Sequence, residues 1–281
     1  MIFLGKKNLK YYLKDKLTEK ELSLVPTSFD VVGDLLIFAD FPKELVKKEK
    51  MIGNKILEIY RHIKVVLKKT KNYSGKFRTP KLKVIAGEKR KETVCKENDV
   101  FLKLDAEKVY FSPRMSGERK RIAQLVMPKE SVLVMFSGCC PYPLVIAKNS
   151  HSKEVYGIEI NPLAHKYALE NIKKNRMEGK VHVFLGDVKM IVPKLKKRFD
   201  RILMPFPKKA EDFLETALRF IKKNGTVHFY DFLHENELDK GEEKILAACK
   251  RLKKICEILE TVKCGQYAPG AYRVCIDFTV K

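Results

Sequence analysis

Three short segments in the second half of the chain carry groups that could together bind a nucleoside. Gly138 follows an apolar run at 132–136, where a small residue lets the backbone approach a ligand and a following helix offers unpaired N–H groups. Glu159 ends the next apolar run, and a carboxylate there can accept hydrogen bonds from both ribose hydroxyls. Asp187 follows the third run, where an acidic side chain could receive an adenine amino group. The pattern predicts a nucleoside-cofactor site and leaves open whether the cofactor is S-adenosylmethionine or NAD.

Plainer explanations exist for two of these residues. A single glycine at 138 is not a glycine-rich fingerprint and also suits an ordinary turn from strand to helix. Glu159 precedes Asn161 and Pro162, which supply a cap and a first-turn residue for a helix. The case for a cofactor therefore depends on the three segments lying at one edge of a sheet.

The elements that would position these residues alternate from Ser131 onward. Apolar runs typical of buried parallel strands are separated by amphipathic helical stretches. The runs are 132–136, 155–160, 181–185, 201–204 and 226–230, and the helical stretches are 142–149, 162–175 and 210–222. A basic amphipathic helix at 235–254 precedes two strands, 258–263 and 272–280, that fit a hairpin. We therefore predict an α/β fold, a Rossmann-like, mostly parallel sheet with an antiparallel C-terminal hairpin, as in class I methyltransferases.

The first part of the chain has a different pattern and predicts a smaller α+β domain. Its expected elements are a helical lead-in at 1–24, two short strands within 29–38 that turn at Gly33 and Asp34, a helix at 43–63, and strands at 65–67, 81–85, 92–95 and 100–104. We place the domain boundary between residues 107 and 108.

The charge of the chain points to a polyanionic partner. Its 281 residues include 58 Lys and Arg against 35 Asp and Glu, a formal charge of +23. Such an excess favours nucleic acid and, second, an anionic membrane surface, although a generally lysine-rich composition gives the same number. Residues 64–83 contain eight basic and no acidic side chains, interleaved with Tyr73 and Phe77, which suits phosphate binding and base stacking or a plain basic surface loop.

Seven cysteines without a C-x-x-C or His/Cys spacing predict neither a disulfide framework nor a zinc site. This favours a reducing cytoplasm. The first residues lack the apolar length of a signal peptide or a membrane span, so no membrane association is expected.

Four segments resemble motifs of the archaeal and eukaryotic tRNA guanine-37 N1-methyltransferases. They are 108–123 (KVYFSPRMSGERKRIA), 77–88 (FRTPKLKVIAGE), 228–232 (HFYDF) and 267–270 (YAPG), and together the likeness covers roughly 25–281. The resemblance implies a monomeric cytoplasmic enzyme, without a metal, that uses S-adenosylmethionine. It implies methylation of N1 of the guanosine next to the anticodon, with the tRNA anticodon stem-loop as partner.

Methylation at N1 has chemical requirements that can be stated independently. Guanine N1 carries a proton and is a poor nucleophile, so a base must remove the proton while a donor stabilises charge on O6. The resemblance implies Glu118 as the base and Arg78 as the O6 partner, with Arg114 as a second candidate. The alternative for Glu118 is a solvated helix carboxylate paired with Arg121 or Arg114.

The chain departs from that family at the cofactor and target-base loops. Val134 stands where an Asp is usual, and Gly138-Cys-Cys140 replaces Gly-x-Gly. Pro205-Phe206-Pro207 replaces Asn-Leu-Pro, which removes an amide associated with the target base, although Phe206 could stack on a base. We expect Phe136 and Pro205, at the ends of the first and fourth strands, to border the cofactor.

Two alternatives follow from these departures. The first is that the chain resembles the wybutosine-pathway enzymes, which transfer an aminocarboxypropyl group from the same cofactor. As in those enzymes, we expect no additional small domain ahead of the α+β module, and the Asn of the Asn-Leu-Pro motif is missing. Arg114, where those enzymes have Ala, argues against them. The other alternative is a non-catalytic RNA-binding protein that has kept the scaffold.

Overall fold

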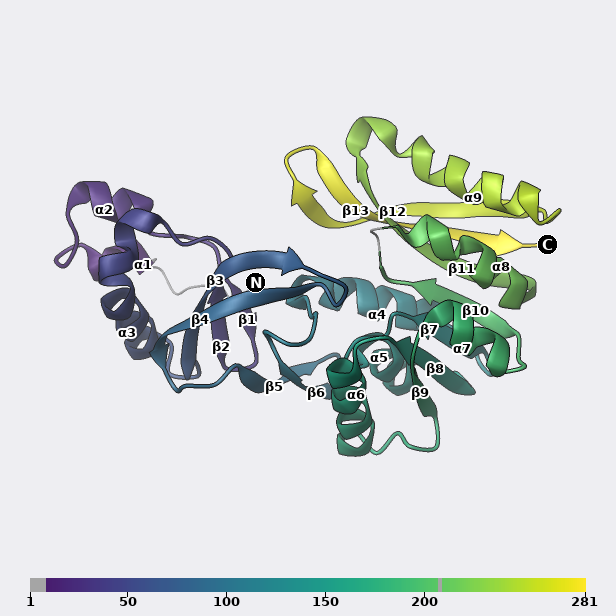
Figure 1. The fold of residues 1–281 in the computed structure, drawn as a ribbon, viewed down its shortest axis with the longest axis horizontal. Helices are drawn as coiled ribbons and strands as arrows, with labels where there is room; N and C mark the ends of the chain where they lie inside the picture. Colours follow the sequence, from purple (N-terminus) through teal and green to yellow (C-terminus); the bar gives the residue numbers. More distant parts are fainter. Residues whose placement is uncertain (1–8, 207–208) are drawn as a thin grey trace. The chain divides into compact units, whose positions relative to one another are not determined.

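The computed structural model describes residues 9–206 and 209–281, which form two compact units (Figure 1). The first unit contains the residues up to Lys96 together with Lys103–Pro113, and the second contains Glu97–Leu102 and Arg114–Lys281. A hairpin of β5 (Glu92–Glu97) and β6 (Val100–Asp105) contributes residues to both. The domain boundary after residue 107 stays a prediction.

The first unit is an α+β module built on a four-stranded sheet. Its order is β1-β2-β3-β4, with β2 parallel to β3 and the other pairs antiparallel. The elements are α1 (Leu9–Leu13), α2 (Glu19–Leu24), β1 (Asp30–Val32), β2 (Leu35–Phe38), the 3-10 helix η1 (Lys43–Lys48), α3 (Glu49–Ile59), β3 (Val65–Ser74) and β4 (Thr79–Gly87). Leu36, Phe38, Ile52 and Ile56 are buried in its core, so the helices cover one face of this sheet.

Two helix predictions for this unit were wrong in their limits. The lead-in is not one helix, because Thr18 caps a second one, accepting from the N–H of Glu21 while the Glu21 carboxylate accepts from the Thr18 N–H. Its first eight positions lie outside the described residues. The helix expected at 43–63 starts as η1 and ends at Ile59, where Tyr60 leaves the helical conformation, and the chain then enters β3 with Ile63 still in the core.

The second unit confirms the predicted Rossmann-like architecture. Its seven-stranded sheet has the order β12-β13-β11-β10-β7-β8-β9, in which β11, β10, β7, β8 and β9 are parallel. The strands are β7 (Ser131–Met135), β8 (Glu154–Glu159), β9 (Val181–Leu185), β10 (Phe199–Met204), β11 (Ile221–His234), β12 (Cys256–Ala268) and β13 (Ala271–Val280). The last two form the expected antiparallel hairpin, seen in yellow in Figure 1.

The helices of this unit join the strands and cover the sheet. They are the 3-10 helix η2 (Pro113–Met115), α4 (Ser116–Leu125), α5 (Pro141–Asn149), α6 (Pro162–Lys174), α7 (Val188–Lys194), the 3-10 helix η3 (Ala210–Phe213), α8 (Leu214–Phe220), the 3-10 helix η4 (Glu235–Glu237) and α9 (Asp239–Arg251). The core combines buried residues of β10 and β11 with Leu214, Leu218 and Ile245 from α8 and α9. Among the described residues, no helix is long and apolar enough to span a membrane.

The sequence pattern missed the helix α7 and made several strands too short, among them β3, β11 and β12. The pattern did not reveal α7, which has only seven residues and contains Pro193. The strand expected at 226–230 is much longer, because β11 pairs with β13 over ten residues from Gly225 to His234. The preceding helix therefore ends at Phe220 instead of reaching 222.

The structure also contains a disulfide that the cysteine pattern did not predict. Cys249, near the end of α9, is bonded to Cys256 at the start of β12, seven positions further along. Among the described residues, Cys95, Cys139, Cys140, Cys264 and Cys275 form no disulfide. One short-range bridge is not a framework, so the structure adds a disulfide on which the cysteine pattern was silent.

Reduction of this bridge is expected to destabilise the second unit. Closing a loop of this size lowers the entropy of the unfolded chain, so reduction should lower the free energy of unfolding by about 2 kcal/mol. Urea unfolding of the wild type with and without reductant measures the difference. The double variant Cys249→Ser/Cys256→Ser should not respond to reductant, whereas Cys264→Ser should respond like the wild type. An equal response of the double variant would contradict the assignment.

Candidate active site

The turn between β7 and α5 has an unusual backbone that suits a bound ligand. Phe136, Gly138 and Cys140 all have positive φ, at 61°, 57° and 78°. The Oγ atom of Ser137 is buried and has no hydrogen-bond partner among the described residues. Gly157 of β8 makes room for this turn, since a Cβ there would lie 2.9 Å from the Ser137 side chain. A strained turn with an unsatisfied buried hydroxyl is typical of a loop that closes on a ligand.

Glu159, at the end of β8, lies directly against this turn. One carboxylate oxygen accepts from the N–H of Gly138 at 2.7 Å and the other accepts from the N–H of Asn161 at 2.7 Å. Burial raises the pKa of Glu159, against the lowering effect of these backbone hydrogen bonds. A carboxylate has about four acceptor positions, so capacity remains for ribose hydroxyls. The structure therefore brings together the first two residues of the predicted site.

The third and fourth loops lie at the same edge of the sheet. The Gly186 N–H donates to the Glu159 carbonyl at 2.9 Å, which places Asp187 next to Glu159 in the loop after β9. Asp187 is exposed and caps α7 by accepting from the Lys189 N–H at 2.8 Å. Pro205 follows β10, and the ring of the next residue, Phe206, lies 5.1 Å from that of Phe136. Pro207 lies outside the described residues.

These observations provide a structural test of the nucleoside-cofactor prediction. The loops after β7, β8, β9 and β10 meet at the carboxyl ends of parallel strands, the usual ligand-binding edge of such sheets. They offer carboxylates for ribose and adenine contacts, an unpaired buried hydroxyl and an aromatic wall. The residues present therefore fit a nucleoside cofactor.

Glu118 of α4 is buried, so the alternative of a solvated helix carboxylate is wrong. Its Oε1 accepts from Arg121 Nη2 at 2.9 Å and from the Tyr230 hydroxyl at 2.6 Å, and its Oε2 accepts from Arg121 Nε at 2.7 Å. A carboxylate has about four acceptor positions, so one remains on Oε2. Glu118 does pair with Arg121, as that alternative proposed, but its carboxylate is buried rather than solvated.

Glu118 lies at the same edge of the sheet as the cofactor loops. Its partner Tyr230 comes one residue after the last β10–β11 pair, Met204 with Phe229, which lies at the carboxyl end of β10. The Tyr142 hydroxyl donates to that of Tyr230 at 3.3 Å, and Tyr142 belongs to α5, the helix that starts at the Gly138 turn. Glu118 is thereby connected to the start of α5 through two buried tyrosines.

The other two candidate residues, Arg114 and Arg78, are not buried. Arg114 is exposed in η2, just before α4. Arg78 belongs to the first unit, in the turn between β3 and β4, where its φ is 51°. Its role at the site stays a prediction from the resemblance. In the same basic stretch, Lys68 and Lys83 both form ion pairs with Glu49 at 2.5 Å, so one of these two positive charges is already compensated.

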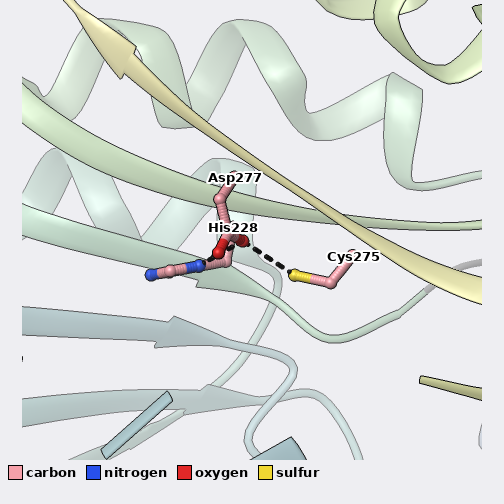
Figure 2. Close-up of side chains that lie close together, drawn as sticks. All are labelled: His228, Cys275 and Asp277. Atoms are coloured by element: carbon pink, nitrogen blue, oxygen red, sulfur yellow. Dashed lines mark hydrogen bonds and ion pairs between the residues drawn. The ribbon is translucent and has the colours of Figure 1, made fainter. Parts of the chain in front are cut away.

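A group of buried polar residues around Glu118 was not found by sequence reasoning. Asp277 of β13 accepts from Arg121 Nη1 at 2.7 Å. It is also hydrogen-bonded to His228 Nδ1 at 2.6 Å (Figure 2). His228 Nε2 lies 2.7 Å from Nη1 of Arg201. The motif at 228–232 marked His228, but Arg121 and Asp277 are 156 positions apart and form no local pattern.

The protonation of His228 follows from its neighbours. Arginine only donates, so Nε2 accepts from Arg201 and the single ring proton is on Nδ1, which donates to Asp277. Burial lowers the pKa of His228, and the attraction of Asp277 offsets this only in part. For Asp277, burial alone would raise the pKa, but hydrogen bonds from His228 and Arg121 hold it well below its usual range. The pair is therefore a neutral histidine beside an ionised carboxylate.

This pair should make stability depend on pH. The folded pKa of His228 is below the unfolded value of about 6.5, so its contribution is complete above that pH and is lost as the pH falls. Asp277 acts in the same direction below about pH 4. We expect the unfolding free energy of the wild type to fall relative to that of His228→Gln by about 1 kcal/mol between pH 7.5 and 5.5. Urea unfolding at both values measures this difference, and a constant difference would contradict the neutral state.

Comparison with known families matches both parts of the chain. Residues 93–259 match the model of the TRM5/TYW2 methyltransferase domain, and residues 9–90 match that of the TYW2 N-terminal domain. The Pyrococcus abyssi tRNA (guanine(37)-N(1))-methyltransferase Trm5b is 38% identical over 91% of this chain and 76% of its own. The Methanocaldococcus jannaschii tRNA(Phe) (4-demethylwyosine(37)-C(7)) aminocarboxypropyltransferase is 33% identical over 89% of this chain and 96% of its own.

Solved structures agree with these matches. The crystal structure of Trm5b from Pyrococcus abyssi superposes with a TM-score of 0.88 at 36% identity, over 99% of this chain and 82% of that one. A complex of aTrm5 with tRNALeu gives 0.84 at 32% identity, over 99% and 80%. Methanocaldococcus jannaschii TYW2 in complex with AdoMet gives 0.69 at 25% identity, over 90% and 99%.

Proposed function

Because this chain belongs to the TRM5/TYW2 methyltransferase family, we propose that it is an S-adenosylmethionine-dependent tRNA methyltransferase that modifies N1 of guanosine 37. The family match confirms the family membership that the four sequence motifs indicated. Relatives that carry this activity in their names align over most of the chain, and one related structure holds tRNA. The net charge of +23 fits such a polyanionic partner.

The carboxyl edge of the sheet supplies the cofactor contacts. Glu159 accepts the ribose hydroxyls, Asp187 receives the adenine amino group, and Phe136, Gly138 and Pro205 border the ligand. When bound, S-adenosylmethionine supplies an electrophilic methyl group on a sulfonium. The backbone at Gly138 and the buried Ser137 hydroxyl are features of this chain that support such a ligand.

The proton transfer is assigned to Glu118. The guanine N1–H would donate to the remaining acceptor position on Oε2, and this carboxylate would take the proton. The bound cofactor would supply the methyl group for N1, and its sulfur would keep the electron pair of the broken sulfur–methyl bond. Arg78 or Arg114 donates to O6, where negative charge grows. The observation that carries this proposal is the buried Glu118 carboxylate, held at the cofactor edge through Tyr230 and Tyr142.

The test is a single-turnover reaction with methyl-labelled S-adenosylmethionine and unmodified tRNA transcripts. We expect label in 1-methylguanosine at position 37, with S-adenosylhomocysteine as the coproduct. Absence of methylguanosine under conditions in which the protein binds both cofactor and tRNA would overturn the proposal. Binding of tRNA without binding of the cofactor would favour a non-catalytic RNA-binding protein.

A second candidate is aminocarboxypropyl transfer to a wyosine precursor. The match of residues 9–90 to the TYW2 N-terminal domain favours it, as does Pro205 in place of the expected Asn. The two reactions break different bonds at the same sulfur. In aminocarboxypropyl transfer, label placed in the aminocarboxypropyl group of S-adenosylmethionine reaches the tRNA. The coproduct is then methylthioadenosine instead of S-adenosylhomocysteine. The names and identities of the relatives favour methyl transfer.

A further inference from the structure

Glu118 is connected to the centre of the sheet by a continuous network of hydrogen bonds, in which Arg121 is half-buried and Glu118, Asp277, His228 and Arg201 are buried. We propose that Asp277, acting through Arg121 and supported by His228, is a positioning residue that holds the Glu118 carboxylate in the orientation needed for proton removal. The inference rests on the proposed function, in which Glu118 is the base. None of these three residues contacts substrate in this scheme.

Arg121 is the residue through which Asp277 orients Glu118. Its guanidinium is planar, and it donates from Nε and Nη2 to the two oxygens of Glu118 and from Nη1 to Asp277. Fixing Nη1 therefore fixes the plane that meets Glu118. Arg121 also has a competing partner, since Glu260 lies 3.8 Å from Nη1 and its side chain is 64% exposed. Without Asp277, the guanidinium can turn toward Glu260 and leave Glu118 misaligned.

Asp277 is itself held by neighbours on the adjacent strand and its own. His228 of β11 and Cys275 of β13 both donate to Oδ1, which leaves Oδ2 for Arg121 (Figure 2). His228 in turn accepts from Arg201 of β10.

Arg201 anchors the far end of the network. It is bonded to both oxygens of Glu130, at 2.7 and 3.0 Å, and to the carbonyl of Leu125 at the end of α4. Its exposed fraction is only 5%. The network thus connects three strands to both ends of the helix that carries Glu118, and rigid strands determine the position of the base.

His228, Cys275 and Asp277 also bring three potential metal-binding atoms within 4.8 Å of one another. Their hydrogen bonds make a metal site the weaker interpretation. The His228 Nδ1 and Cys275 Sγ atoms point their protons at Asp277, and the guanidinium groups of Arg121 and Arg201 adjoin the cluster. A metal cation would have to displace these protons between two existing cations.

The first test is Asp277→Asn, which keeps the shape of the side chain. Asparagine has one oxygen and one amide donor, but Arg121, His228 and Cys275 all approach this position as donors. We expect the single-turnover rate of methyl transfer to fall about 10- to 100-fold through misplacement of Glu118. The dissociation constants for tRNA and S-adenosylmethionine should stay within about twofold, because the binding loops are unchanged.

The matched control is Glu97→Gln. Glu97 forms a buried ion pair with Arg119, which lies on the same helix as Glu118. We expect this variant to lose stability but to keep the single-turnover rate within about twofold, because it does not touch Glu118. An equal loss of rate in Glu97→Gln would show a general effect of destabilising α4 and overturn the inference. Arg121→Lys keeps the positive charge but loses the planar guanidinium that donates to both oxygens of Glu118, so its single-turnover rate should fall as in Asp277→Asn. If Asp277→Asn does not fold, Arg121→Lys takes its place in the test.

The outcomes separate this inference from the proposed function. If the wild type forms 1-methylguanosine and Asp277→Asn reacts within about threefold of it, Asp277 is not a positioning residue. If the wild type forms no methylated product, the proposed function fails. The crystal structure of Asp277→Asn then still tests the geometry: an unchanged Glu118 carboxylate would overturn the inference. If zinc copurifies with the wild type but not with Asp277→Asn, then His228, Cys275 and Asp277 form a metal site, and the positioning network is excluded.

Discussion

Replacing Glu118 by glutamine is expected to reduce the single-turnover rate of methyl transfer by about 10³-fold while tRNA binding is retained. Glutamine has nearly the same shape, but its amide cannot take the N1 proton, and its NH₂ faces either Arg121 or Tyr230, both of which donate to Glu118. Rapid-quench kinetics with saturating S-adenosylmethionine measures the rate, and filter binding measures tRNA affinity.

Two comparisons make this result specific to proton removal. Glu118→Asp keeps the carboxylate but withdraws it by one methylene, so it should recover part of the lost rate. Loss of tRNA affinity together with rate would indicate disruption of α4 instead. A rate in Glu118→Gln close to that of the wild type would remove Glu118 as the base.

Replacing Glu159 by alanine is expected to weaken S-adenosylmethionine binding about 100-fold. The substitution removes charge-assisted hydrogen bonds to ribose, and such a bond has a net contribution of about 1.5–3 kcal/mol. It also leaves the N–H of Gly138 without its present acceptor, so the turn at 136–140 loses support. Isothermal titration calorimetry with S-adenosylmethionine measures the change.

Glu154→Gln is the matched control for this measurement. Glu154 starts the same strand that Glu159 ends, and its carboxylate bonds to Ser131 and to Lys197 at the opposite edge of the sheet. We expect its cofactor affinity to equal that of the wild type. Equal weakening in both variants would mean that β8 as a whole is destabilised, and an unchanged affinity in Glu159→Ala would exclude the ribose contact.

The sequence predicted the α/β half of the molecule well because its signals are local. Each parallel strand is a short apolar run followed by a polar loop, and carboxyl ends of parallel strands necessarily meet at one edge. Gly138 and Glu159 could therefore be placed together before their 2.7 Å hydrogen bond was seen. The limits of α3 and β11 were less predictable, because they depend on where the chain must turn and on the length of a neighbouring strand.

The surroundings of Glu118 could not be predicted for the opposite reason. Arg121 is a local neighbour, but Tyr230 and Asp277 reach it through pairings of β11 with β10 and β13. Nothing in the spacing distinguishes a buried carboxylate in such a network from a solvated one on an exposed helix. The bridge between Cys249 and Cys256 was missed because the number and spacing of cysteines were used to judge the chain as a whole. They do not show which two cysteines come together where a helix ends and a strand begins.

The turn between β7 and α5 has a further consequence for how a ligand would be captured. Phe136 and Cys140 adopt positive φ although both carry side chains, and each such residue costs about 1–2 kcal/mol relative to glycine in the same conformation. A loop with one glycine explores fewer conformations than a loop with several glycines. The side chains of Cys139 and Cys140 are completely buried, which restricts the loop further. Such a loop loses less conformational entropy when it closes on a cofactor. The departure from Gly-x-Gly therefore makes this segment a pre-organised receptor rather than a flexible one.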